Sequence, residues 1–117
     1  MPPQIEPSPR PDWSPLPGEG VVGVMGRVLV REWGFFIAML RFEPQAHINE
    51  HAGINDTVVI CIDGEGWTSV AGDPAQLRAG QIVRWPKNVR HHLWTEGTTM
   101  TTLMFEREAG AAEAAPA

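Results

Sequence analysis

The sequence predicts an all-β domain, and three observations lead to that class. Twelve glycines and eleven prolines separate short runs rich in Val, Ile, Trp and Phe. Such punctuation interrupts helices and favours many short strands. Eight or nine strand-like runs recur at regular spacing, and no segment carries a convincing helical period. The expected architecture is an antiparallel double-sheet jelly-roll β-barrel, in which short strands form two facing sheets.

Length and charge limit the possible partners. The 117 residues suffice for one domain with one hydrophobic core. Fourteen acidic and nine basic residues give a formal net charge of −5, and Lys87 is the only lysine. Because the scattered arginines form no basic stripe, we expect no nucleic-acid partner. No apolar stretch is long enough to span a bilayer, so we expect no membrane partner. The single cysteine, Cys61, excludes an internal disulfide and suits a cytoplasmic protein.

Residues 1–19 are predicted to form a proline-rich arm that precedes a barrel domain over residues 20–107. Seven prolines lie within the first 17 residues. Proline lacks the backbone N–H that a central strand needs, so the arm is extended or disordered. We expect it to dock on the domain through Trp13.

The first strands of the domain are expected soon after the arm. Residues 21–25 and 28–30 form two short strands, or one strand that bends at Gly26. A Trp-Gly turn then leads to residues 35–42, which are apolar on both faces up to Arg41. This pattern is typical of a strand that is covered on each side.

The second half of the domain alternates β-forming runs with turn signals. Residues 57–62 form one such run, and Asp63-Gly64 predicts a hairpin with residues 66–70 as the partner strand. The last strands are expected at residues 81–85, 91–94 and 100–105. Residues 108–117 are rich in Ala and Glu and predict a tail with no core-facing pattern.

The turn spacing resembles that of the cupin family, over roughly residues 35–106. The second cupin motif reads G-x5-P-x-G-x2-H-x3-N, and Gly80, Pro86 and His91 match its spacing. Asn88 takes the place of the turn glycine, which is a reasonable replacement because asparagine tolerates positive φ. The resemblance implies a jelly-roll barrel with a pocket in its interior.

Adjacent histidines follow this motif. Because side chains alternate along a regular strand, His91 and His92 face opposite sides of the sheet. The motif spacing selects His91 as the ring that points into the barrel. Trp85 and Trp94 lie close to this strand in the sequence, and either can form a wall of the pocket.

The first cupin motif, G-x5-H-x-H-x3-4-E-x6-G, is only partly present. Asn49, His51 and Asp56 keep its spacing with two replacements. Counting back from Gly64 instead places His51 in the first histidine position. A third register places Glu50 in that position. The sequence leaves these three registers open.

The resemblance also implies a site for one divalent metal ion, Fe, Mn, Zn or Ni, held by His51, Asp56 and His91. Glu50 and His47 are then available for proton transfer. His47 has the strand parity of His51, but an extended chain separates the two by roughly 13 Å. Both therefore cannot hold the same ion unless the strand contains a bulge.

Several functions follow from this resemblance. One is a metal-dependent dioxygenase or isomerase that acts on a small organic molecule. The alternative is a metal-free cupin that binds or senses a small molecule without catalysis, and a third is a structural dimer with a filled interior. A homodimer is expected in each case, because open jelly rolls leave sheet edges that need covering.

Overall fold

The computed structural model describes residues 1–108, which form eight strands and no helix. The predicted all-β class is confirmed. Within these residues there is accordingly no helix that could span a membrane. Residues 109–117, most of the predicted tail, lie outside the described residues. The strands are β1 (Arg10–Pro15), β2 (Val21–Glu32), β3 (Phe35–Ala52), β4 (Asp56–Val70), β5 (Asp73–Arg78), β6 (Ile82–Trp85), β7 (Arg90–Trp94) and β8 (Met100–Arg107).

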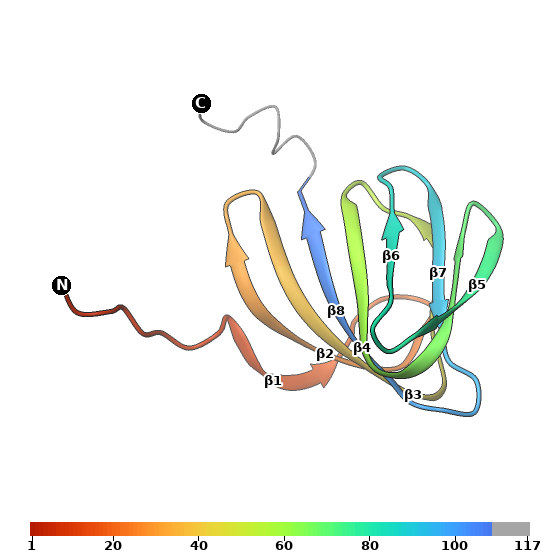
Figure 1. Cartoon of the computed structure of the whole chain (residues 1–117), viewed down its shortest axis with the longest axis horizontal. Helices are drawn as coiled ribbons and strands as arrows, with labels where there is room; N and C mark the ends of the chain where they lie inside the picture. The colour runs from red at the N-terminus through yellow and green to blue at the C-terminus, as the bar shows by residue number, and fades with distance from the viewer. Residues whose placement is uncertain (109–117) are drawn as a thin grey trace.

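The eight strands form one continuous antiparallel hydrogen-bonded network that folds over into two facing layers, described below as two sheets (Figure 1). One has the order β1-β2-β3-β8-β4-β6, and the other consists of β7 and β5 together with parts of β2, β3 and β4. The two long strands β3 and β4 belong to both sheets. β3 pairs with β8 through residues 35–42 and with β7 through residues 47–52. β4 pairs with β8 through residues 56–64 and with β7 through residues 67–70. This arrangement is the predicted jelly roll.

Gly64 lies inside β4, and the hairpin predicted at Asp63-Gly64 is wrong. The chain continues as one strand and changes its pairing partners at this point. Gly64 has a φ of +73°, and a Cβ there would clash with the backbone carbonyl of Thr99. Glycine is therefore required where β4 bends from one sheet into the other. Gly80, by contrast, lies in the predicted turn, between β5 and β6.

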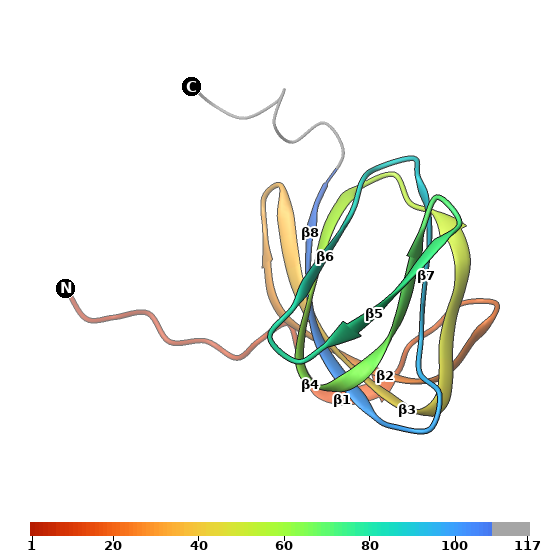
Figure 2. The ribbon, with the colours of Figure 1, turned by 45° about the vertical axis from the view of Figure 1, so that its right-hand side comes forward.

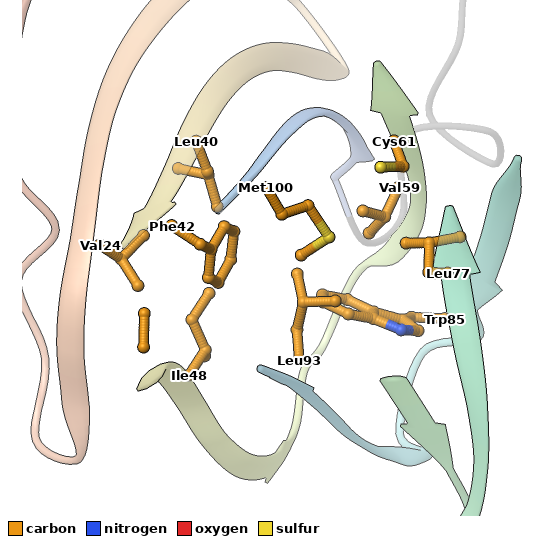
Figure 3. Packing of buried hydrophobic residues seen from close by; sticks show 11 residues of the cluster. Val24, Leu40, Phe42, Ile48, Val59, Cys61, Leu77, Trp85, Leu93 and Met100 are labelled. Carbon is orange, nitrogen blue, oxygen red and sulfur yellow. The ribbon is translucent and has the colours of Figure 1, made fainter. Parts of the chain in front are cut away.

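One hydrophobic core lies between the sheets. Figure 3 shows Phe42, Leu93 and Met100 gathered in the interior, and all three are fully buried. Cys61 is also fully buried in this cluster, as a free thiol. Burial raises the pKa of the Cys61 thiol, so the reactive thiolate is disfavoured. Cys61 is thus a packing residue of the core.

The N-terminal arm contributes an edge strand. β1 pairs with β2 alone, and this position tolerates Pro11 and Pro15 because an edge strand needs fewer backbone donors. The Trp13 ring lies against the guanidinium groups of Arg27 and Arg41, 5.4 and 4.8 Å from the ring centroid. The residues before β1 extend away from the barrel (Figures 1 and 2). The arm therefore contacts the domain at Trp13.

Candidate functional site

A cavity of about 590 Å³ lies inside the barrel. It is lined by residues of β2, β3, β4, β6, β7 and β8 and of the loops before β2 and after β3. Most of its wall is apolar, with contributions from Leu16, Val21, Phe36, Leu40, Ile48, Trp85 and Met104. Its polar lining includes Asn49, His51, Asn55, Thr57, His91 and Glu106. A mostly apolar cavity of this size with a few polar groups is typical of small-molecule sites.

His51 and His91 lie directly across from each other on β3 and β7. Their rings meet edge to face, with 4.4 Å between centroids. The β3–β7 register shifts between Ile48 and His51. Without that bulge, regular alternation from the buried Ile48 would turn His51 outward and Glu50 inward. The bulge is what brings the two histidines together in the cavity.

Backbone carbonyls fix the tautomer of both rings. Nδ1 of His51 lies 2.9 Å from the carbonyl oxygen of Asn49, and Nδ1 of His91 lies 3.2 Å from that of Val89. Because a carbonyl oxygen can only accept, each Nδ1 must carry the proton in these hydrogen bonds. When the rings are neutral, the lone pair of each is on Nε2. The pair therefore offers hydrogen-bond acceptors.

The environment of His91 keeps its ring neutral. The residue is only 4% exposed, and the Trp85 indole stacks on the ring with 4.1 Å between centroids and 8° between planes. Burial lowers the pKa of His91, and a charge on His51 lowers it further, although the hydrogen bond to Val89 opposes both effects. At neutral pH, His91 is thus a base without its second proton.

Asp56, which the resemblance implies as a ligand beside His51 and His91, is not among the residues that line the cavity. Its Oδ1 accepts a hydrogen bond from the backbone N–H of Lys87 at 2.9 Å. The next backbone N–H, that of Asn88, donates to the carbonyl of Gly53, and Asn88 has the predicted positive φ, +64°. Asp56 therefore holds the turn before His91 and has its carboxylate engaged there.

The two residues predicted for proton transfer also lie elsewhere. Glu50 forms an exposed ion pair with Arg90, with 3.4 Å between Oε1 and Nε. His47 lies in a shallow groove with His92 and Trp94. The His92 ring stacks on Trp94, and burial and the neighbouring His47 lower its pKa, against the effect of Glu50. Neither predicted residue lines the cavity, so neither can exchange a proton directly with a molecule held there.

The donors in the cavity do not fit a divalent metal site. Catalytic zinc sites use three protein ligands, and the facial triad of non-haem iron uses two histidines and a carboxylate. Over residues 1–108, no three His, Cys, Asp or Glu side chains are placed to hold an ion together. His51 and His91 supply only two donors. The carboxylate of Glu106 accepts hydrogen bonds from Asn55 and Thr57, at 3.0 and 3.4 Å.

Glu106 is a lining residue that the sequence analysis missed. The buried Met100 and Thr102 and the cavity-lining Met104 share its parity on β8. The same alternation extended by one step predicts that Glu106 also faces inward.

Trp85 is one of the two tryptophans predicted to form the pocket wall, and it does line the cavity. The other, Trp94, lies in the shallow groove with His47.

Comparisons with known proteins agree with this architecture. A family model described as a cupin domain matches residues 38–105. No curated protein matches the chain in sequence. The polyketide cyclase RemF from Streptomyces resistomycificus superimposes with a TM-score of 0.78 at 13% identity, over 92% of this chain and 80% of that one. KdgF from Halomonas sp. superimposes with a TM-score of 0.69 at 15% identity, over 83% of this chain and 86% of that one. An RmlC-like cupin from Shewanella frigidimarina superimposes with a TM-score of 0.68 at 21% identity, over 74% of this chain and 78% of that one. At these identities the likeness shows the fold alone.

Proposed function

Because the chain belongs to the cupin-domain family, we propose that it binds a small organic molecule inside its barrel, without a metal ion. The molecule would contact the apolar walls of the cavity and donate a hydrogen bond to the pair His51 and His91. This is the metal-free alternative among the functions that the sequence leaves open. A metal-dependent dioxygenase or isomerase would need a third ligand beside the two histidines.

The observation that carries the proposal is the contact of Nδ1 with a backbone carbonyl in both histidines of the pair. Nδ1 of each ring faces a backbone carbonyl, so a neutral ring has only the Nε2 lone pair to offer to a bound molecule. A bound molecule must therefore bring the proton, as a hydroxyl, phenol or N–H group. Phe36 and Trp85 on the wall favour a flat ring as the apolar part.

Two matched probes test the proposal. 2-Naphthol has a ring and a phenolic donor, and 2-methoxynaphthalene has the same ring without the donor. We expect 2-naphthol to bind about tenfold more tightly at pH 7.5, which corresponds to one net hydrogen bond. Isothermal titration calorimetry measures both affinities.

Variants assign the difference to the cavity. His91→Phe should reduce the ratio between the two affinities to about one, because the ring shape stays and the acceptor is lost. His47→Phe changes a histidine that does not line the cavity and should keep the wild-type ratio. Equal affinities for the two probes in the wild-type protein, or no binding of either, would refute the proposal.

A further inference from the structure

A chain of three contacts links the His91 ring to Trp85, Thr68 and the backbone of His92. Trp85 stacks on that ring almost in parallel, and Trp85 is itself only 3% exposed. The indole Nε1–H donates to Oγ1 of Thr68 at 3.1 Å. The Thr68 hydroxyl donates in turn to the backbone carbonyl of His92 at 2.9 Å. His92 follows His91 in the chain, so the contacts return to β7, the strand that carries the His91 ring.

Thr68 is suited to this position by its chemistry and its place in the fold. A hydroxyl has one proton, which here goes to the His92 carbonyl, and its lone pairs can accept from the indole. Thr68 is 3% exposed and lies on β4 opposite Leu93 of β7, whereas Trp85 comes from β6. The hydrogen bond therefore joins the part of β4 that pairs with β7 to a side chain from the other sheet.

From this geometry we propose that Thr68 is a positioning residue for the cavity. It fixes the plane of the Trp85 indole, and the indole fixes the plane of the His91 imidazole. The second side-chain torsion of histidine is intrinsically broad, so a single contact at Nδ1 leaves the ring freedom to rotate. A ring held in one plane presents its acceptor to a bound molecule without an ordering cost. This inference rests on the proposed function for its effect on binding, but its effect on the His91 ring does not depend on that function.

The test replaces the Thr68 hydroxyl with a methyl group of similar size. Thr68→Val should move the NMR signals of the His91 ring protons downfield, because the ring leaves its position over the indole. It should also lower the ratio between the 2-naphthol and 2-methoxynaphthalene affinities at least threefold. Thr68→Ser keeps the hydroxyl and should preserve both properties.

A matched control is available in Thr102. Its side chain is also fully buried, and its hydroxyl has no hydrogen-bond partner within residues 1–108. Thr102→Val should therefore leave the His91 signals and the affinity ratio unchanged. A merely structural role for Thr68 would lower stability without moving the His91 signals.

A second variant keeps the proposal testable if Thr68→Val folds poorly. Trp85→Phe retains an aromatic ring against His91 and removes the N–H, so it should reduce the affinity ratio by a similar factor. In the double variant with Thr68→Val and Trp85→Phe, the two reductions of the affinity ratio should not add, because both changes remove the hydrogen bond between Trp85 and Thr68. Unchanged His91 signals in Thr68→Val would overturn the positioning role. If those signals move but the wild-type protein binds neither probe, the proposed function fails and the positioning of the ring stands.

Discussion

His51 on β3 lies opposite His91 on β7, and the edge of one imidazole meets the face of the other at a centroid distance of 4.4 Å. Two protonated rings at this distance would repel each other. Since burial already disfavours a charge on His91, the protonated state of this ring is costly in the folded protein. The pairing thus links the pH of the solution to stability and to the acceptor that the cavity offers.

Stability should decrease as the pH falls below about 6.5, the ordinary pKa of histidine. The pKa of His91 is lower in the folded than in the unfolded chain, so the unfolded chain binds more protons in this range. Neutral His91 makes its full contribution to the free energy of unfolding above the pKa that the residue has in the unfolded chain. This contribution is lost as the pH falls through the lower pKa of the folded protein, with a slope of up to about 1.4 kcal/mol per pH unit for one proton. Urea unfolding between pH 5 and pH 8 measures this slope. His91→Gln should reduce it but not remove it, because the pKa of His92 is also lowered. An equal slope in that variant would contradict the assignment.

Gly64→Ala should destabilise the protein strongly. A side chain at this position meets a positive φ and a backbone carbonyl, that of Thr99, which cannot move aside cheaply. We expect a loss of about 3 kcal/mol or more in the free energy of unfolding. Gly72 is the control, because it has a similar φ of +85° but nothing within 4 Å of the added Cβ. Gly72→Ala should cost about 1 kcal/mol, from the backbone conformation alone. Equal losses in urea titrations would mean that the contact with Thr99 is unimportant.

Trp13→Ala should lower stability by about 1–2 kcal/mol. The change removes an aromatic ring that contacts two guanidinium groups and holds β1 on β2. Trp33 serves as the comparison, since it is 62% exposed, and Trp33→Ala should change stability by no more than about 0.5 kcal/mol. Thermal unfolding followed by circular dichroism compares the two. A larger effect of Trp33→Ala would show that the contact of the arm at Trp13 contributes little.

The fold could be predicted because its signals are local. Gly80, Pro86 and Asn88 are turn residues whose backbone preferences do not depend on distant contacts, and Asn88 has the positive φ that its position in the motif requires. Gly64 shows the limit of such signals. Asp-Gly is as compatible with a bend inside a strand as with a hairpin, and the pairing of β4 with both β8 and β7 decides between them.

The site was less predictable because it depends on a bulge. Strand parity alone places His47 and His51 on one face, and the register shift after Ile48 separates them. Nothing in the residues between Ile48 and His51 specifies that shift, which follows from the pairing of β3 with β7. Asp56 has the spacing of a ligand in the first motif, but its carboxylate is used to hold the turn at Lys87. Spacing along the chain could not reveal that competing hydrogen bond.

The incomplete donor set of the cavity leads to a last prediction, on metal binding. Each histidine of the pair donates Nδ1–H to a backbone carbonyl, the arrangement that orients metal-binding histidines in proteins, and what is missing is a third ligand. Asn49 lines the same cavity two residues before His51, and the carbonyl that it offers to His51 belongs to the backbone. Asn49→His should therefore add an imidazole without disturbing that hydrogen bond.

We expect Zn²⁺ to bind the Asn49→His variant at least about tenfold more tightly than the wild-type protein, which corresponds to about 1.4 kcal/mol. Asn49→Gln, which removes the same side chain and adds no imidazole, should bind Zn²⁺ as weakly as the wild type in calorimetric titrations. Tight binding of one Zn²⁺ per chain by the wild-type protein would show that a third ligand joins His51 and His91, and the metal-free proposal would then be wrong.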